Sequence, residues 1–67
     1  MIELNGEPTE VEPDATLANV LALLGLSMQS RGVAVAVDGA VVQRALWDTY
    51  KLAPDAHIEV LTAMQGG

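Results

Sequence analysis

The chain has no cysteine, no phenylalanine and few basic residues, and these shortages exclude several classes of function. Without cysteine there is no disulfide framework, no zinc–thiolate cluster and no thiol nucleophile, a pattern compatible with a reducing compartment. Three basic residues stand against nine acidic ones, which gives a net charge of −6. Nucleic-acid binding needs clustered cations, so we do not expect this chain to bind nucleic acids. An acidic surface instead favours solubility and steers the chain towards a basic partner.

The chain also lacks length and long apolar runs. Its 67 residues, 51% of them apolar, predict one domain over residues 1–67 with a small core. A domain of this size cannot enclose a deep catalytic cavity. No run approaches the ~20 apolar residues of a membrane span, and no basic leader precedes an apolar segment. We therefore expect no membrane partner and a cytoplasmic location.

The first half of the chain predicts a hairpin followed by a helix. Residues 1–5 alternate as a half-buried strand does, and Asn5-Gly6 is a typical tight-turn pair. Residues 9–12 are predicted to return as an edge strand, since prolines stand on both sides of them. Thr16 is the expected N-cap of a short helix that ends at Gly25. Its apolar stripe consists of Leu17, Val20, Leu21 and Leu24.

The second half predicts three more strands and an irregular cover. Residues 33–37 alternate valine and alanine, Asp38-Gly39 favours a second hairpin, and residues 40–43 form the return strand. Residues 45–54 have no period; we expect Trp47 to fill the core and Tyr50 to lie at its rim. Residues 57–62 form the last strand, with Leu61 on the face opposite to Ile58 and Val60. The class is therefore α+β.

No set of side chains in the sequence predicts an active site. His57 is the only histidine, and with Glu59 beside it on a strand it is expected to form a surface pair. The carboxylates are not spaced as ligands of calcium or magnesium, and no glycine-rich phosphate loop is present. We therefore expect no metal, no bound cofactor and no catalytic residue.

The most informative stretch is Met64-Gln65-Gly66-Gly67, after the last strand. Glycine has no Cβ, so such a backbone can enter a channel too narrow for side chains. Gln65 and Gly66 would thread that channel and present the α-carboxylate of Gly67. Another enzyme could join this carboxylate to AMP, and a sulfur nucleophile could then displace AMP to leave a thiocarboxylate. The alternatives are a frayed chain end or a cloning remnant.

Features of the second half, in their order along the chain, match a known family pattern. They are the valine–alanine strand at 33–37, Val41-Val42 followed by Arg44, then Trp47, Leu52, Ile58-Glu59-Val60 and the closing Gln65-Gly66-Gly67. In a chain of this length they resemble the ThiS family, the sulfur carriers of thiamine (thiazole) biosynthesis. Two departures concern turn shape: Asp55-Ala56 stands where the family commonly has Gly-Asp, and Gln43 where it often has proline.

The resemblance implies a ubiquitin-like β-grasp fold, a mixed sheet of four to five strands that grips one helix. Its first and last strands would be central and parallel, and residues 63–67 would form a flexible functional tail. It further implies that a ubiquitin-activating-type adenylyltransferase consumes ATP to activate Gly67. A sulfur donor enzyme would then supply sulfur, and thiazole synthase would receive it. The chain would be a protein co-substrate and not an enzyme.

Two sets of expectations come from position and from related carriers. Leu61, Ala63 and Met64 lie near the tail, and we interpret them as apolar docking residues, with ordinary sheet coverage as the alternative for Leu61. The small subunit of molybdopterin synthase also ends in Gly-Gly, although it often has a proline-rich approach that this chain lacks. Two alternatives remain. The chain could be a ubiquitin-like modifier that is joined to lysines, or a binding module whose glycine end is incidental.

Overall fold

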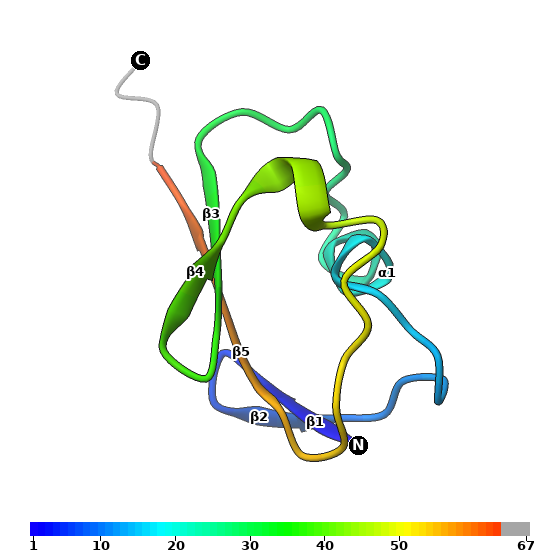
Figure 1. Ribbon diagram of the computed structural model, residues 1–67. Coiled ribbons are helices and arrows are strands. Elements are labelled where there is room, and N and C mark those ends of the chain that lie inside the picture. The colour runs from blue at the N-terminus through cyan, green and yellow to red at the C-terminus, as the bar shows by residue number, and fades with distance from the viewer. Residues whose placement is uncertain (64–67) are drawn as a thin grey trace.

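Five strands and one α-helix are present in residues 1–63, the part of the chain that this computed structural model describes (Figure 1). One mixed sheet has the strand order β2-β1-β5-β3-β4, so β5 is central. β1 and β5 are parallel neighbours, whereas the other pairs are antiparallel. This arrangement confirms the α+β class and the expected β-grasp topology. The elements are β1 (Ile2–Leu4), β2 (Glu7–Thr9), α1 (Leu17–Leu23), β3 (Val33–Val37), β4 (Ala40–Val42), the 3-10 helix η1 (Arg44–Leu46) and β5 (His57–Thr62).

The first hairpin turns where expected, but the position of its return strand was predicted wrongly. Asn5 and Gly6 have φ of 50° and 86°, the positive values that a two-residue turn requires. This turn fixes the register Leu4↔Glu7 and Ile2↔Thr9, so β2 is Glu7–Thr9 and not residues 9–12. Pro8 is tolerated inside β2 because its partner Glu3 directs its own N–H away from β2, to the carbonyl of Ala56.

The helix begins with reciprocal capping bonds at the expected residue. The Thr16 N–H donates to Oδ1 of Asn19 over 2.9 Å, and the Asn19 N–H donates to Oγ1 of Thr16 over 3.4 Å. The next two N–H groups are bound by the irregular segment after η1. Leu17 donates to the carbonyl of Tyr50 and Ala18 to that of Trp47. The donors of the first turn are therefore satisfied without solvent.

The helix ends in a Schellman motif around Gly25, as the glycine predicted. Gly25 has φ of 77°, its N–H donates to the carbonyl of Ala22, and Leu26 donates to Leu21 over 2.9 Å. Leu24 was wrongly assigned to the apolar stripe. It is the C-cap residue and is 41% exposed, because the helical period has ended before its side chain can turn inward.

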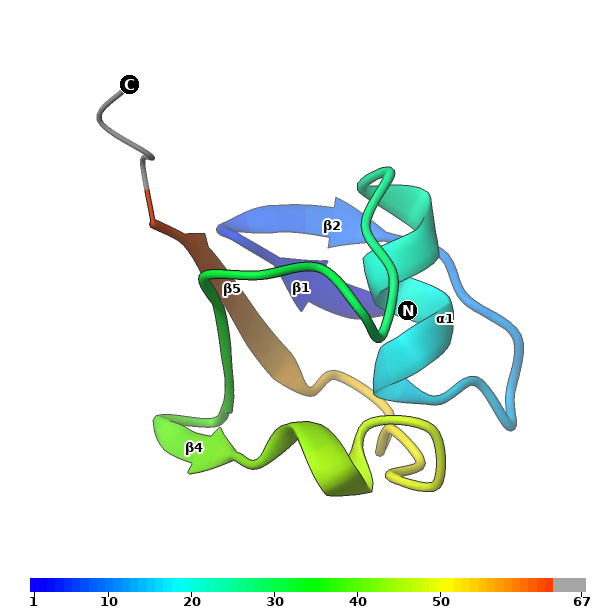
Figure 2. The ribbon, with the colours of Figure 1, turned by 90° about the horizontal axis from the view of Figure 1, so that it is seen from above.

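The core lies between the inner face of the sheet and α1, which sits inside the curve of the sheet (Figure 2). Trp47 fills it, as expected: the indole is 2% exposed, and its Nε1–H donates to the carbonyl of Val42 over 2.9 Å. Tyr50 packs part-buried against it. The largest fully buried side chains are Trp47, Leu17, Leu21, Ile58, Val20 and Val35.

Candidate functional site

The end of β5 brings the chain to the candidate functional tail. Thr62 pairs with Val33 of β3, and the Ala63 N–H then donates to the carbonyl of Gly32 over 2.6 Å. Met64, Gln65, Gly66 and Gly67 lie outside the described residues, so their predicted roles in docking, threading and covalent carriage remain predictions. The structure locates the base of the tail at Ala63, which is bonded to Gly32 at the end of the sheet where β3 begins.

An exposed apolar surface lies on the outer face of the sheet near this base. Alternation along β5 buries Ile58 and Val60 and turns Leu61 outward, where it is 67% exposed. Leu61 pairs with Ala34 of β3, and the next strand contributes Val41, which is 77% exposed and pairs with Ala36. We call Ala34, Ala36, Val41 and Leu61 the outer apolar patch, which Glu59, the β5 partner of Ala36, borders on the same face. Exposed apolar surface beside a predicted functional segment is typical of an interaction surface.

The sequence-based expectations about this face were partly met. Leu61 faces outward near the tail, as predicted, and Ala63 is exposed beside it. Val41 was missed, although the Asp38-Gly39 turn contained the necessary signal. A two-residue hairpin pairs Val35 with Val42, and this register forces Val41 to the opposite face.

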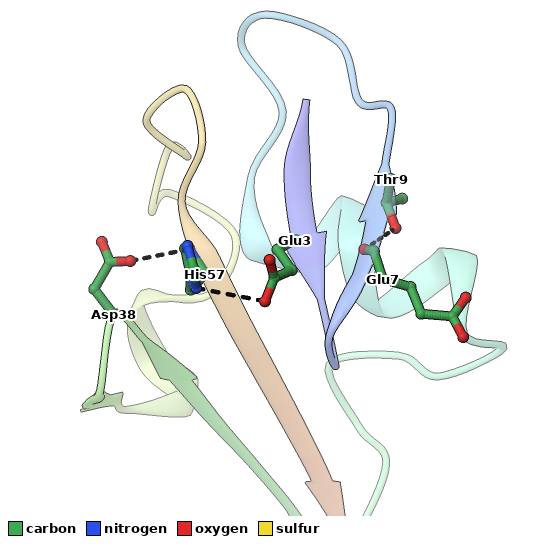
Figure 3. A network of polar contacts seen from close by, with 5 residues as sticks. All are labelled: Glu3, Glu7, Thr9, Asp38 and His57. Atoms are coloured by element: carbon green, nitrogen blue, oxygen red, sulfur yellow. Dashed lines mark hydrogen bonds and ion pairs between the residues drawn. The ribbon is translucent and has the colours of Figure 1, made fainter.

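The histidine forms a surface pair, but with a different carboxylate from the predicted one. His57 Nδ1 lies 3.5 Å from Oε2 of Glu3 across the parallel ladder, because these two residues are register partners (Figure 3). The prediction of Glu59 is wrong for that reason. The two side chains are 63% and 45% exposed, and the His57 N–H donates to Oδ1 of Asp38 over 2.9 Å. Such an exposed pair contributes little to stability.

Two further findings about residues 1–63 concern metal ions and membranes. A hollow of about 550 Å³ lies beside His57, at the end of β5 opposite to Ala63. Its lining includes Glu3, Asp38 and Glu59, yet residues 1–63 contain no group of three potential ligands arranged to hold a metal ion. Within the same residues, no helix has both the length and the apolar character needed to cross a membrane.

Comparison with known proteins agrees with this architecture. The crystal structure of a thiamine biosynthesis protein (ThiS) from Geobacter metallireducens is similar with a TM-score of 0.77 and 26% identity, covering 98% of this chain and 97% of that one. An NMR structure of a thiamine biosynthesis protein from the same organism has a TM-score of 0.76 and 26% identity, covering 98% and 86%. No curated protein matches the chain. The sequence model of the ThiS family matches residues 2–67. The chain therefore belongs to the ThiS family.

Proposed function

We propose that this protein is a sulfur carrier of thiamine biosynthesis that carries sulfur on the C-terminal carboxylate of Gly67. The observation that carries the proposal is the family match, which runs through the predicted tail to residue 67. The likeness to solved thiamine biosynthesis proteins over nearly the whole chain supports it. In this role the chain is a protein co-substrate, and the catalytic groups belong to its partners.

The proposed chemistry has two steps on the terminal carboxyl group, the first at an oxygen atom and the second at the carbon atom. A ubiquitin-activating-type adenylyltransferase lets the carboxylate of Gly67 attack the α-phosphorus of ATP, so that pyrophosphate leaves and an acyl adenylate forms. A sulfide-level nucleophile from a sulfur donor enzyme then attacks the acyl carbon. AMP leaves with one of the original carboxylate oxygens, and sulfur takes its place. Thiazole synthase is the proposed acceptor of that sulfur.

The outer apolar patch is the proposed docking surface for these partners. Leu61 lies two residues before Ala63, at the end of β5 where the tail begins, and Val41 extends the patch along the sheet to the level of Glu59. A partner that contacts Leu61 therefore also faces Ala63. From residue 62 to residue 67 an extended chain spans roughly 17 Å. That reach allows the body to dock outside a cleft while Gly66 and Gly67 thread into it. Ala63 and Met64 would extend the apolar contact towards the cleft.

The direct test is the intact mass of the protein after incubation with ATP, its adenylating enzyme and a sulfur source. We expect a mass increase equal to the replacement of one oxygen by sulfur, located at Gly67 by fragmentation. A variant with one alanine added after Gly67 is the matched control, since it moves the reactive carboxylate off the glycine pair. An unmodified mass with a demonstrably active partner enzyme would overturn the proposal. Transfer of Gly67 to lysines would identify a protein modifier instead.

A further inference from the structure

The side chain of Arg44 bridges elements that are distant in sequence. Its Nη2 donates to the carbonyl of Ser30 over 2.6 Å, and its Nη1 donates to the carbonyl of Met28. The guanidinium carbon lies 4.6 Å from the centroid of the Trp47 ring. Because the Trp47 indole is itself fixed by its bond to Val42, the guanidinium has a rigid surface on one face and two acceptors at its edge.

The segment that Arg44 binds leads directly to the base of the tail. In residues 26–32, Leu26 and Met28 pack against the core, whereas Arg31 and Gly32 are exposed. Gly32 has φ of 68°, a backbone conformation that favours glycine, and its carbonyl accepts the Ala63 N–H. Arg44 thus binds the chain two residues before Gly32, and the backbone through Arg31 connects this contact to the bond between Gly32 and Ala63.

We propose that Arg44 is a positioning residue for the carrier tail. It holds residues 28–32 in the conformation that places the Gly32 carbonyl against the Ala63 amide, and so it fixes where and in which direction the chain leaves the sheet. The role requires arginine. Lysine has one compact ammonium group, which cannot reach both carbonyls as a planar fork does and stacks less well on the indole.

The functional consequence rests on the proposed sulfur-carrier role. A tail whose first residue is already held in place loses less conformational freedom when it enters a partner's cleft. Loss of Arg44 should therefore raise the KM of the adenylating enzyme for this protein. The kcat should stay unchanged, because no group of Arg44 touches the reacting carboxylate in this scheme.

Amide hydrogen exchange measured by NMR tests the positioning without any partner enzyme. In both Arg44→Lys and Arg44→Met, the amide hydrogen of Ala63 should exchange roughly three- to tenfold faster than in the wild type. This factor corresponds to the loss of about one net hydrogen bond. Amides in the middle of β5 serve as internal references. Ile2→Val is the control variant, since it removes one methyl group from the buried side chain in β1 and leaves the Arg44 contacts alone. Unchanged exchange at Ala63, or equal acceleration along all of β5, would overturn the proposal.

Steady-state kinetics of adenylation supply the second readout. We expect KM to rise several-fold for both Arg44 variants, with kcat unchanged and with Ile2→Val equal to wild type. A fall in kcat alone would contradict the positioning role. If the wild type is not adenylated at all, the proposed function fails, while the exchange data still decide whether Arg44 holds Ala63.

Discussion

Truncation of Leu61 tests whether the outer apolar patch is a docking surface. The side chain is 67% exposed and lies on the face of β5 opposite to the core residues Ile58 and Val60. Leu61→Ala should therefore change the free energy of unfolding by no more than about 0.5 kcal/mol, as most surface substitutions do. Any effect on the partner reaction then reports on docking and not on folding.

The expected size of the effect follows from the surface that Leu61 still has to bury. Complete burial of a leucine side chain contributes about 1.5–3 kcal/mol. Since 67% of the residue is accessible, docking can bury at most that share. We expect Leu61→Ala to lose roughly 1–2 kcal/mol of binding free energy, which corresponds to an increase of about 5- to 30-fold in KM.

The assay is ATP–pyrophosphate exchange by the adenylating enzyme at varied concentrations of this protein. Leu23→Ala is the matched control: Leu23 is 60% exposed, but it lies on α1, on the other side of the sheet from Leu61 (Figure 2). We expect Leu23→Ala to keep the wild-type KM and Leu61→Ala to raise it. Equal KM values for both variants would refute the docking surface. It would also be refuted if Leu61→Ala lowered the urea midpoint enough for unfolding to account for the rise in KM.

Three further substitutions test the core and the tail. Leu21→Ala should cost about 2–5 kcal/mol in urea unfolding, because the side chain is 1% exposed against the sheet; an unchanged midpoint would contradict the packing. Trp47→Phe should lower the free energy of unfolding by about 1–3 kcal/mol, since it leaves the Val42 carbonyl without its indole donor. A thermal or urea melt measures this loss, and an unchanged stability would show that water replaces the bond. Gly66→Val should leave the melting curve unchanged and block adenylation, whereas normal adenylation would count against threading through a narrow channel.

The sequence was sufficient wherever the determinants are local. Asn5-Gly6 and Asp38-Gly39 each place two positive φ angles in succession, so both turns were predictable from four residues, although the return strand of the first hairpin was placed too late in the sequence. The capping bonds between Thr16 and Asn19 and the closing bonds around Gly25 likewise join residues at most five positions apart. Such features need no information about the rest of the chain.

Pairings between distant residues could not be predicted by this route. The contact of His57 with Glu3 depends on β1 and β5 being parallel neighbours, and periodicity within one strand does not specify its neighbour. The resemblance to a family supplied that pairing, but not its register. The Arg44 bridge was missed for the same reason: the motif marked Arg44 and Trp47 as characteristic, whereas the acceptors in residues 28–30 have no sequence signature of their own.

The central position of β5 suits the proposed work of the tail. A carrier must keep its body folded while its end is drawn into a partner's cleft. β5 is paired with β1 on one side and with β3 on the other, and the β3 ladder runs through five residue pairs from Val33↔Thr62 to Val37↔Ile58. Fraying from the tail must break these pairs in order, and the first contact to open is the Ala63 bond to Gly32. In our proposal Arg44 holds the segment that carries the Gly32 carbonyl. It therefore stabilises the fold at the point where β5 would begin to separate from the sheet.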